Sequence, residues 1–272
     1  MGETTIGWTA TVKDGVTHAG FTFNIWIGCS KTSPGCMKCF AERDNNFRHW
    51  IPAWGGPRKR TSPAYWKQPL KWAREATAQG ITKKVFCGSL MDIFDAEVDQ
   101  SWRDDAFALV ETCAAIGGLE WLFLTKRIEN AAAMLPAAWL AQPPGYVRIG
   151  VTAENQAMAD KRIPELLRVW KGKNFISVEP MLGPVNIYRA FSATYPGLSL
   201  SEKIGLHLDW IVAGAESGPG AREMQLDWAR SLRDECVASG TPYFLKQAVT
   251  GGKLTREPYL DGRQWLEFPE EK

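Results

Sequence analysis

The chain has 272 residues, of which 45% are hydrophobic and 23% are charged, and its formal net charge is +2. These values are ordinary for a soluble globular protein with a substantial core. The small net charge gives no global electrostatic argument for nucleic-acid binding, although a local basic patch stays open. No run of about 18 apolar residues occurs, which argues against a membrane span. The first residues also lack the basic and apolar segments of a signal peptide, so we expect a cytoplasmic protein with no membrane partner.

The order of apolar and amphipathic segments predicts an α/β fold. Residues 1–20, with a turn at Asp14-Gly15, predict an N-terminal hairpin or arm. Seven apolar runs predict strands at Phe21–Ile27, Lys84–Ser89, Glu120–Thr125, Val147–Thr152, Asn174–Glu179, Leu208–Gly214 and Thr241–Gln247. Helices are predicted from Phe40 towards His49 and at Leu70–Gln79, Gln100–Ile116, Ile128–Leu135, Gln156–Trp170 and Asp227–Ser239. Residues 51–69 hold four prolines and predict a long irregular loop.

Because a helix or a long connection separates each strand from the next, the strands are expected to be parallel. Apolar parallel strands that alternate with amphipathic helices indicate an α/β fold, closed as a partial or complete barrel over residues 21–250. Residues 251–272 are then a C-terminal extension.

Three of the six cysteines, Cys29, Cys36 and Cys39, lie close together with C-x6-C-x2-C spacing. In a reducing compartment, clustered thiols favour a metal over a disulfide. Three thiolates are one short of a closed structural zinc site, but they suit an iron–sulfur cluster. If one iron of a four-iron cluster had no protein ligand, it could bind a small molecule. The other cysteines, Cys87, Cys113 and Cys236, have apolar neighbours and are expected to be buried.

Polar or small residues follow every predicted strand, at the ends where α/β folds bind ligands. In chain order they are Cys29; Ser89 and Asp92; Thr125, Lys126 and Arg127; Thr152, Glu154 and Asn155; Glu179; Glu216, Ser217 and Gly218; and Lys246 with Gln247. Each alone could be an ordinary helix cap or strand terminus, but seven in succession predict a polar rim that forms the active site. A carboxylate after an apolar run, such as Glu179, requires a cation, a hydroxyl or an amine. Lys126, Arg127 and Lys246 could bind a carboxylate or phosphate.

Most of the thirteen tryptophans have the spacing of core residues. Trp50 and Trp54 instead lie near His49 and the basic run Arg58–Arg60. Such a loop could stack bases and hold phosphate, although a solvated loop is the plainer interpretation.

The cysteine loop resembles the cluster loop of radical S-adenosylmethionine (SAM) enzymes, where the usual spacing is C-x3-C-x2-C. With its wider first gap, the chain resembles more specifically the phage-protein three-cysteine-motif family, which has radical-SAM-like character. The similarity runs from about residue 21 to the C-terminus. It is carried by the segments Trp26–Cys29, Ser33–Cys36, Leu124–Arg127, Gly150–Gln156, Val178–Pro184, Gly214–Arg222 and Phe244–Gln247.

The resemblance implies a partial TIM-type barrel and a [4Fe-4S] cluster on Cys29, Cys36 and Cys39, with S-adenosyl-L-methionine on the open iron. Reduction, by an electron donor such as flavodoxin or ferredoxin, would cleave SAM to methionine and a 5′-deoxyadenosyl radical that abstracts a substrate hydrogen. By analogy with radical SAM barrels, the cofactor-binding residues would be Ser89 at the amino end, Thr152, Glu154 and Asn155 at the ribose, and Glu216, Ser217 and Gly218 near the adenosyl or carboxylate part. Asp92, Glu179 and Lys246 complete this set.

The chain departs from radical SAM enzymes at two places. Lys38 precedes the third cysteine, where those enzymes usually have an aromatic residue, and Phe40 would take over the shielding. The second strand also lacks their common Gly-Gly-Glu.

Two alternatives stay open. One is a zinc-bearing nucleic-acid-binding module, which needs a fourth ligand such as His49 and would explain the basic run Arg58–Arg60. The other is a barrel whose cluster is structural or redox-sensing. The substrate is open as well: a nucleotide or nucleic acid is attractive, and a peptide or small metabolite remains an alternative.

Overall fold

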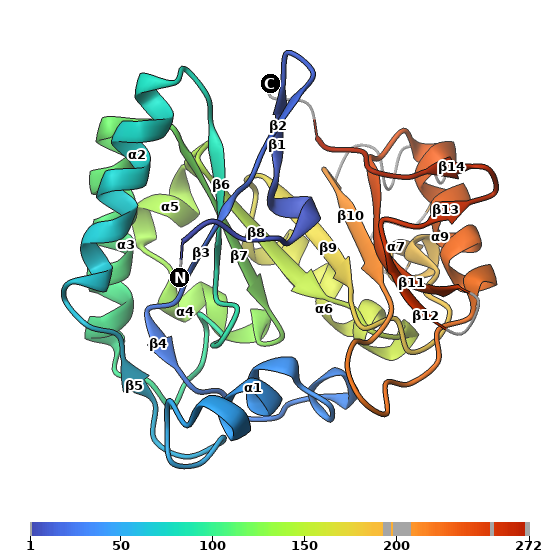
Figure 1. Ribbon diagram of the computed structural model, residues 1–272, viewed down its shortest axis with the longest axis horizontal. Coiled ribbons are helices and arrows are strands. Elements are labelled where there is room, and N and C mark those ends of the chain that lie inside the picture. The colour runs from blue at the N-terminus through green and yellow to red at the C-terminus, as the bar shows by residue number, and fades with distance from the viewer. Residues whose placement is uncertain (1, 193–196, 198–207, 251–252, 270–272) are drawn as a thin grey trace. The chain divides into compact units, whose positions relative to one another are not determined.

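The computed structural model describes residues 2–192, 197, 208–250 and 253–269 (Figure 1). It divides into two compact units. The first comprises Met1–Thr32 and Cys39–Ile149, and the second comprises Ser33–Lys38 and Gly150–Lys272. The cysteine loop therefore contributes to both units. The predicted limits of a barrel domain at residues 21 and 250 stay a prediction.

The first unit begins with the short 3₁₀ helix η1 (Gly7–Thr9) and the antiparallel strands β1 (Thr11–Lys13) and β2 (Val16–His18). Asp14 and Gly15 both have positive φ, 51° and 75°. Two-residue hairpin turns of type I′ require this conformation, so the sequence predicted the hairpin correctly. The side chain of Lys84 donates to the Ala10 carbonyl at 2.9 Å and connects this segment to strand β6 (Lys83–Cys87).

Strands β3 (Phe21–Phe23), β6 (Lys83–Cys87) and β7 (Leu119–Thr125) form the parallel sheet of the first unit, in that order. Helices α2 (Gln68–Ala78) and α3 (Gln100–Ile116) connect them and lie side by side (Figure 1). Asp99 caps α3, because its carboxylate accepts from the Ser101 N–H. The short helices η4 (Ile128–Asn130), α4 (Ala131–Met134) and α5 (Ala137–Ala141) lead to β8 (Val147–Thr152), whose first half belongs to this unit.

The predicted strand Phe21–Ile27 is wrong in its second half. It ends at Phe23, because the buried Asn24 side chain accepts from the Leu90 N–H at 2.8 Å and donates to Ser89 Oγ at 2.9 Å. The chain then turns away, and Trp26–Ile27 (β4) pairs antiparallel with Lys59–Arg60 (β5). The predicted irregular loop over residues 51–69 thus contains a strand, and it also contains the 3₁₀ helix η3 (Tyr65–Lys67).

The second unit contains the short 3₁₀ helix η2 (Pro34–Cys36), the second half of β8, and strands β9 (Asn174–Val178), β10 (Ile211–Gly214) and β11 (Tyr243–Thr250). Along the chain, its strands are connected by helices that include α6 (Gln156–Val169), α7 (Ile187–Ser192) and α9 (Leu226–Ser239). Strands β9, β10 and β11 are parallel, and β12 (Lys253–Arg256) adds an antiparallel neighbour to β11. The predicted C-terminal extension therefore supplies one strand of the sheet, and it also forms the hairpin of β13 (Tyr259–Leu260) and β14 (Arg263–Gln264).

Within each unit the parallel strands lie side by side in chain order, without a reversal. A doubly wound sheet reverses its order at a switch point, whereas a (β/α) barrel adds each strand beside the previous one. Strands β6, β8, β9 and β10 are buried throughout, as parallel strands covered on both faces should be. The expected α/β fold, a partial barrel of the TIM type with parallel strands, is confirmed.

Aromatic side chains dominate the core of both units. Phe21 stacks on Trp72 with ring centroids 4.4 Å apart in the first unit, and Trp210 packs against Phe268 at 5.8 Å in the second. Five tryptophans are fully buried: Trp8, Trp26, Trp121, Trp170 and Trp210. The predictions that most tryptophans, and Cys87, Cys113 and Cys236, are core residues are confirmed. Among the described helices, none is both long and apolar enough to cross a membrane.

Candidate functional site

The three cysteines of the loop are the accessible thiols of the chain. Cys29 follows β4, Cys36 ends η2, and Cys39 is the N-cap of helix α1 (Phe40–Arg48). All three are half-buried thiols outside any disulfide, whereas the other three cysteines are buried. The donor set available to a metal or cluster is therefore the C-x6-C-x2-C set.

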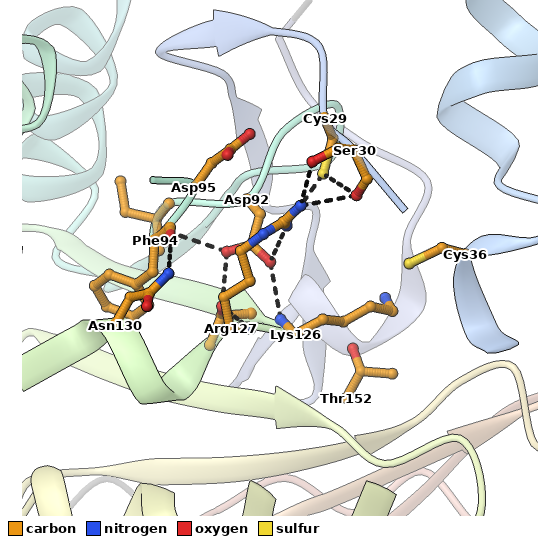
Figure 2. Close-up of polar contacts among 12 residues, drawn as sticks. Cys29, Ser30, Cys36, Asp92, Phe94, Asp95, Lys126, Arg127, Asn130 and Thr152 are labelled. Atoms are coloured by element: carbon orange, nitrogen blue, oxygen red, sulfur yellow. Dashed lines mark hydrogen bonds and ion pairs between the residues drawn. The ribbon is translucent and has the colours of Figure 1, made fainter. Parts of the chain in front are cut away.

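Arg127, the second residue after β7, binds the start of the loop (Figure 2). Its Nη1 donates to Cys29 Sγ at 3.4 Å, and its Nη2 donates to the Ser30 carbonyl at 2.8 Å and to Ser30 Oγ at 3.0 Å. Its side chain is only 8% exposed and is paired with Asp92 at 3.1 Å. The guanidinium thus fixes Cys29 and Ser30 against the end of a core strand.

Asp92, after β6, is the anion that holds Arg127 in place. Its buried carboxylate accepts from Thr125 Oγ1 at 2.6 Å, from the Lys126 N–H at 2.9 Å and from the Phe94 N–H at 3.1 Å. With Arg127, four donors of the protein use its oxygens. The structure thus assigns Asp92 to organising the end of β7, and a direct contact with a cofactor stays a prediction.

The surroundings of Cys29 disfavour its thiolate. Burial and the Asp92 carboxylate raise the pKa of the Cys29 thiol to about 12, although the Arg127 guanidinium opposes them. Binding of a metal or cluster at Cys29 must therefore displace a proton.

A second buried arginine, Arg58, reaches the same loop residue from the proline-rich segment. Its Nε donates to Asp95 Oδ2 at 2.8 Å and its Nη2 to Ser30 Oγ at 3.1 Å, and its side chain is 2% exposed. Arg60 pairs with Asp105 at 2.6 Å. The predicted phosphate-binding run Arg58–Arg60 is therefore mostly engaged with carboxylates, and Lys59 is its one cation without an acidic partner among the described residues.

In the second unit, Glu154 holds the turn before Cys36. Its Oε1 accepts from the Gly35 N–H at 3.0 Å, and its Oε2 pairs with Arg162 at 2.8 Å. Burial alone would raise the pKa of this carboxyl, but Arg162 and hydrogen bonds from Ser33 and Gly35 hold it below its usual value. Arg162 also donates to the carbonyl of the fully buried Thr152 at 2.8 Å.

The loop after β10 holds the same turn. Glu216 pairs with Arg222, whose Nη1 donates to the Pro34 carbonyl at 2.9 Å. Lys38 donates to the Gly220 carbonyl. Burial would raise the pKa of Glu216, but the bonds from Arg222 lower it. In the described contacts, Glu154 binds the cysteine loop directly and Glu216 positions Arg222, which binds the loop. The expected contacts of both glutamates with a cofactor stay predictions.

The remaining predicted residues comprise one helix cap, three residues in strand-end loops and one charged pair. Asn155 caps α6 by accepting from the Met158 N–H at 3.0 Å, which is an ordinary helix cap. Ser89 binds Asn24, Ser217 is half-exposed, and Gly218 has a φ of 101° that suits its turn. Glu179 directly follows β9, whereas Lys246 lies within β11 and not at its end as expected, and the two side chains pair at 2.9 Å.

Gly214 makes room for this pair. A Cβ on residue 214 would lie 2.8 Å from Glu179 Oε1 and 3.3 Å from Gln247 Cγ. Glu179 and Lys246 are both partly exposed, so the pair offers one negative and one positive group to a ligand. An amino acid, with its ammonium and carboxylate, matches such a pair.

Among the described residues, no group of three or more His, Cys, Asp or Glu side chains is gathered in an arrangement that could hold a metal ion. The alternative zinc site also loses its proposed fourth ligand. Cys39 and His49 cap opposite ends of the nine-residue helix α1, and a rise of about 1.5 Å per residue separates them by roughly 15 Å. Ligands of one zinc ion lie about 2.0–2.3 Å from it.

A sequence family described as "Protein of unknown function (DUF5131)" matches residues 4–269. The chain belongs to this family. No curated protein matches the DUF5131 chain. Two solved structures of spore photoproduct lyase variants resemble it. The first has a TM-score of 0.48 and 10% identity over 81% of this chain and 74% of that chain. The second has a TM-score of 0.49 and 9% identity over 88% of this chain and 78% of that chain.

Sequence reasoning missed the arginines that bind the loop. Arg162 lies among Ala159, Ile163 and Leu166 on the buried face of α6. A buried arginine requires an anion, so this break in the apolar face could have pointed to Glu154. Nothing in the sequence of this DUF5131 chain singles out Arg58 from its exposed neighbour Lys59.

Proposed function

We propose that this DUF5131 protein is a radical SAM enzyme in which Cys29, Cys36 and Cys39 hold a [4Fe-4S] cluster with one iron open to S-adenosyl-L-methionine. The observation that carries the proposal is the selective exposure of these three thiols. They are the accessible half of the six cysteines, they share one loop, and three cysteines leave one iron of such a cluster without a protein ligand. The likeness of the loop and of the strand-end segments to the phage-protein three-cysteine-motif family supports the same assignment.

The donor set fits the cluster in chemistry. Iron–sulfur clusters are held by cysteine thiolates and are tuned by hydrogen bonds to their sulfurs. Here the three thiols are outside any disulfide and partly exposed, and Cys29 Sγ receives a guanidinium N–H. A closed zinc site would need a fourth ligand, and helix α1 keeps His49 away from Cys39.

Each residue around the loop has a defined task under this proposal. Arg127 holds Cys29, whereas Glu154 and Arg222 hold the turn that precedes Cys36. Glu179 would accept an N–H from the amino group of the methionyl part of SAM, and Lys246 would donate to its carboxylate. When bound, cluster and SAM together would supply the 5′-deoxyadenosyl radical that abstracts a substrate hydrogen. An electron donor such as flavodoxin or ferredoxin would reduce the cluster.

The substrate class proposed here is a nucleotide or nucleic acid. Support comes from helix α1 and the residues after it. Phe47 is 84% exposed, the Arg48 guanidinium lies 5.5 Å from the centre of the Trp50 ring, and Lys59 donates to the Trp50 carbonyl at 3.4 Å. Exposed rings beside cations are typical of surfaces that stack bases and track phosphates.

Anaerobic reconstitution tests the proposal. The protein, incubated with iron and sulfide, should turn brown, contain about four irons per chain as a [4Fe-4S] cluster requires, and form 5′-deoxyadenosine from SAM on reduction. Cys36→Ala should remove iron and leave the fold intact. A colourless protein with one zinc ion per chain would refute the cluster, and a cluster that yields no 5′-deoxyadenosine would favour a structural or redox-sensing role.

A further inference from the structure

Arg127 is placed on a sulfur, which is an unusual acceptor for a buried guanidinium. Its Nη1 lies 3.4 Å from Cys29 Sγ and 3.1 Å from Asp92 Oδ2. Its Nη2 binds two oxygens of Ser30, the residue after the cysteine. The side chain thus contacts both a candidate cluster ligand and the backbone that carries it (Figure 2).

Hydrogen bonds from Arg127 to Asp92, and from the residues around Asp92 to its carboxylate, fix the position of this guanidinium. Asp92 is held by Thr125 Oγ1 and by two backbone N–H groups, and it receives Nη1 of Arg127. Because the donors and acceptors are buried, neither charge can reorient towards water without breaking several hydrogen bonds. Arg127 therefore presents its N–H to the sulfur in one geometry.

We propose that Arg127 is a positioning residue that holds Cys29 as a cluster ligand and raises the reduction potential of the cluster. The inference rests on the proposed function. Reduction adds one electron, so the reduced cluster carries more negative charge on its sulfurs. A guanidinium N–H on one of these sulfurs stabilises the reduced form more than the oxidised form, and in a buried site this effect is weakly screened.

The competing interpretation is that Arg127 only neutralises the buried Asp92. Arg58 is the matched control for it. Both arginines are nearly fully buried, both pair with an aspartate, and both donate to Ser30 Oγ. The described acceptors of Arg58 are all oxygens, whereas Arg127 also donates to Cys29 Sγ. A purely structural role predicts the same behaviour for both variants.

The experiment compares the reconstituted wild type with Arg127→Gln, Arg127→Lys and Arg58→Gln. It measures iron and sulfide per chain, thermal unfolding, and the midpoint potential by a redox titration followed by electron paramagnetic resonance. Arg127→Gln should lower the equilibrium constant for reduction about tenfold, which is about 59 mV for one electron. Arg127→Lys should shift the potential in the same direction by less, because lysine keeps the positive charge but cannot donate through two nitrogens as the guanidinium does. Arg58→Gln should lose stability with an unchanged potential.

Results other than these expected potential shifts contradict the inference. If Arg127→Gln does not fold, the potential of Arg127→Lys is decisive, and an unchanged value overturns the proposal. Equal shifts in the Arg127 and Arg58 variants overturn it too, because they indicate a general loosening of the loop. A wild type that binds no iron overturns the proposed function and this inference together, whereas an intact cluster with an unchanged potential in both Arg127 variants overturns this inference alone.

Discussion

Gly35 and Glu154 are in direct contact, with the Gly35 N–H donating to Glu154 Oε1 at 3.0 Å. A Cβ on residue 35 would lie 3.0 Å from the carboxyl carbon of Glu154. The carboxylate is also fixed by Arg162 from helix α6. A glycine beside a buried, paired carboxylate therefore sets the backbone just before Cys36.

Glu154→Ala should be strongly destabilising. It removes the acceptor of Gly35 and leaves the Arg162 guanidinium buried without its anion, a change that typically costs about 3 to 5 kcal/mol. Urea unfolding of the purified variant measures this loss. Glu165→Ala is the control on α6, the helix that carries Arg162, since its pair with Arg168 is largely exposed, and it should change the free energy of unfolding by less than about 1 kcal/mol. Equal losses in the two variants would contradict the assigned role of Glu154.

Stability should also fall in acid because of Glu154. Its pKa is held below that of an unfolded-state glutamate, which is about 4.3. Its ionised form therefore stabilises the fold above that pH, and this contribution is lost as the pH falls through the lower folded-state pKa. Glu216 has a pKa shift of the same sign. The free energy of unfolding, measured from pH 7 down to pH 3, should decline less steeply in Glu154→Gln than in the wild type, and parallel curves would contradict this.

The sequence was sufficient for the order and type of most elements. Helix α3 was predicted at its observed limits, Gln100–Ile116, because Gly117 and Gly118 signal its end; the structure adds the Asp99 cap at its start. Strand β8 was likewise predicted at Val147–Thr152. Strand β12 was missed, because Lys253–Arg256 is short and exposed throughout and has a single apolar residue, Leu254. Pairing with β11 makes it a strand, and such pairing is not encoded locally.

The candidate donors of the site stand out in the sequence, whereas their contacts do not. Cys29, Cys36 and Cys39 stand out by spacing and chemistry, and their shared exposure agrees with that interpretation. The partners of the loop come from distant segments: Arg127 lies 98 residues from Cys29, and Glu154 lies 119 residues from Gly35. A polar side chain at a strand end can contact either a ligand or another part of the protein. The sequence does not distinguish the two, because the partner is determined only when the chain is folded.

Thiol labelling of the cluster-free protein should separate the cysteines into three groups. At pH 8, Cys36 and Cys39 should react with iodoacetamide first, because they are half-exposed. Cys29 should react more than about tenfold more slowly, since its raised pKa leaves little thiolate. Cys87, Cys113 and Cys236 should react only after unfolding. Peptide mass spectrometry measures the order, and reconstitution with iron and sulfide should protect all three loop cysteines. Early labelling of Cys87 would contradict the described core.

Gly214→Ala should disturb the Glu179–Lys246 pair. The added methyl group would lie 2.8 Å from Glu179 Oε1, and overpacking of this kind costs about 1 to 3 kcal/mol. If the pair binds the methionyl part of SAM, the affinity of the reconstituted protein for SAM should fall as well, as measured by calorimetry. Gly183→Ala is the control, because its Cβ would meet nothing within 4 Å. A Gly214→Ala protein with unchanged stability and SAM affinity would remove the pair from the proposed site.

The exposed ring of Phe47 should contribute to binding of single-stranded nucleic acid, if that is the substrate class. Stacking of one base on an aromatic side chain is worth about 1 to 3 kcal/mol, so Phe47→Ala should weaken binding of a fluorescent oligonucleotide at least about fivefold in an anisotropy titration. Arg48→Gln should weaken it too and reduce its dependence on salt, because one fewer phosphate contact releases fewer counterions. Tyr259→Ala removes a ring that is 69% exposed in the C-terminal hairpin, and it should have no effect. If all three variants bind as the wild type does, nucleic acid is not recognised by helix α1, and a small metabolite or peptide becomes the better candidate.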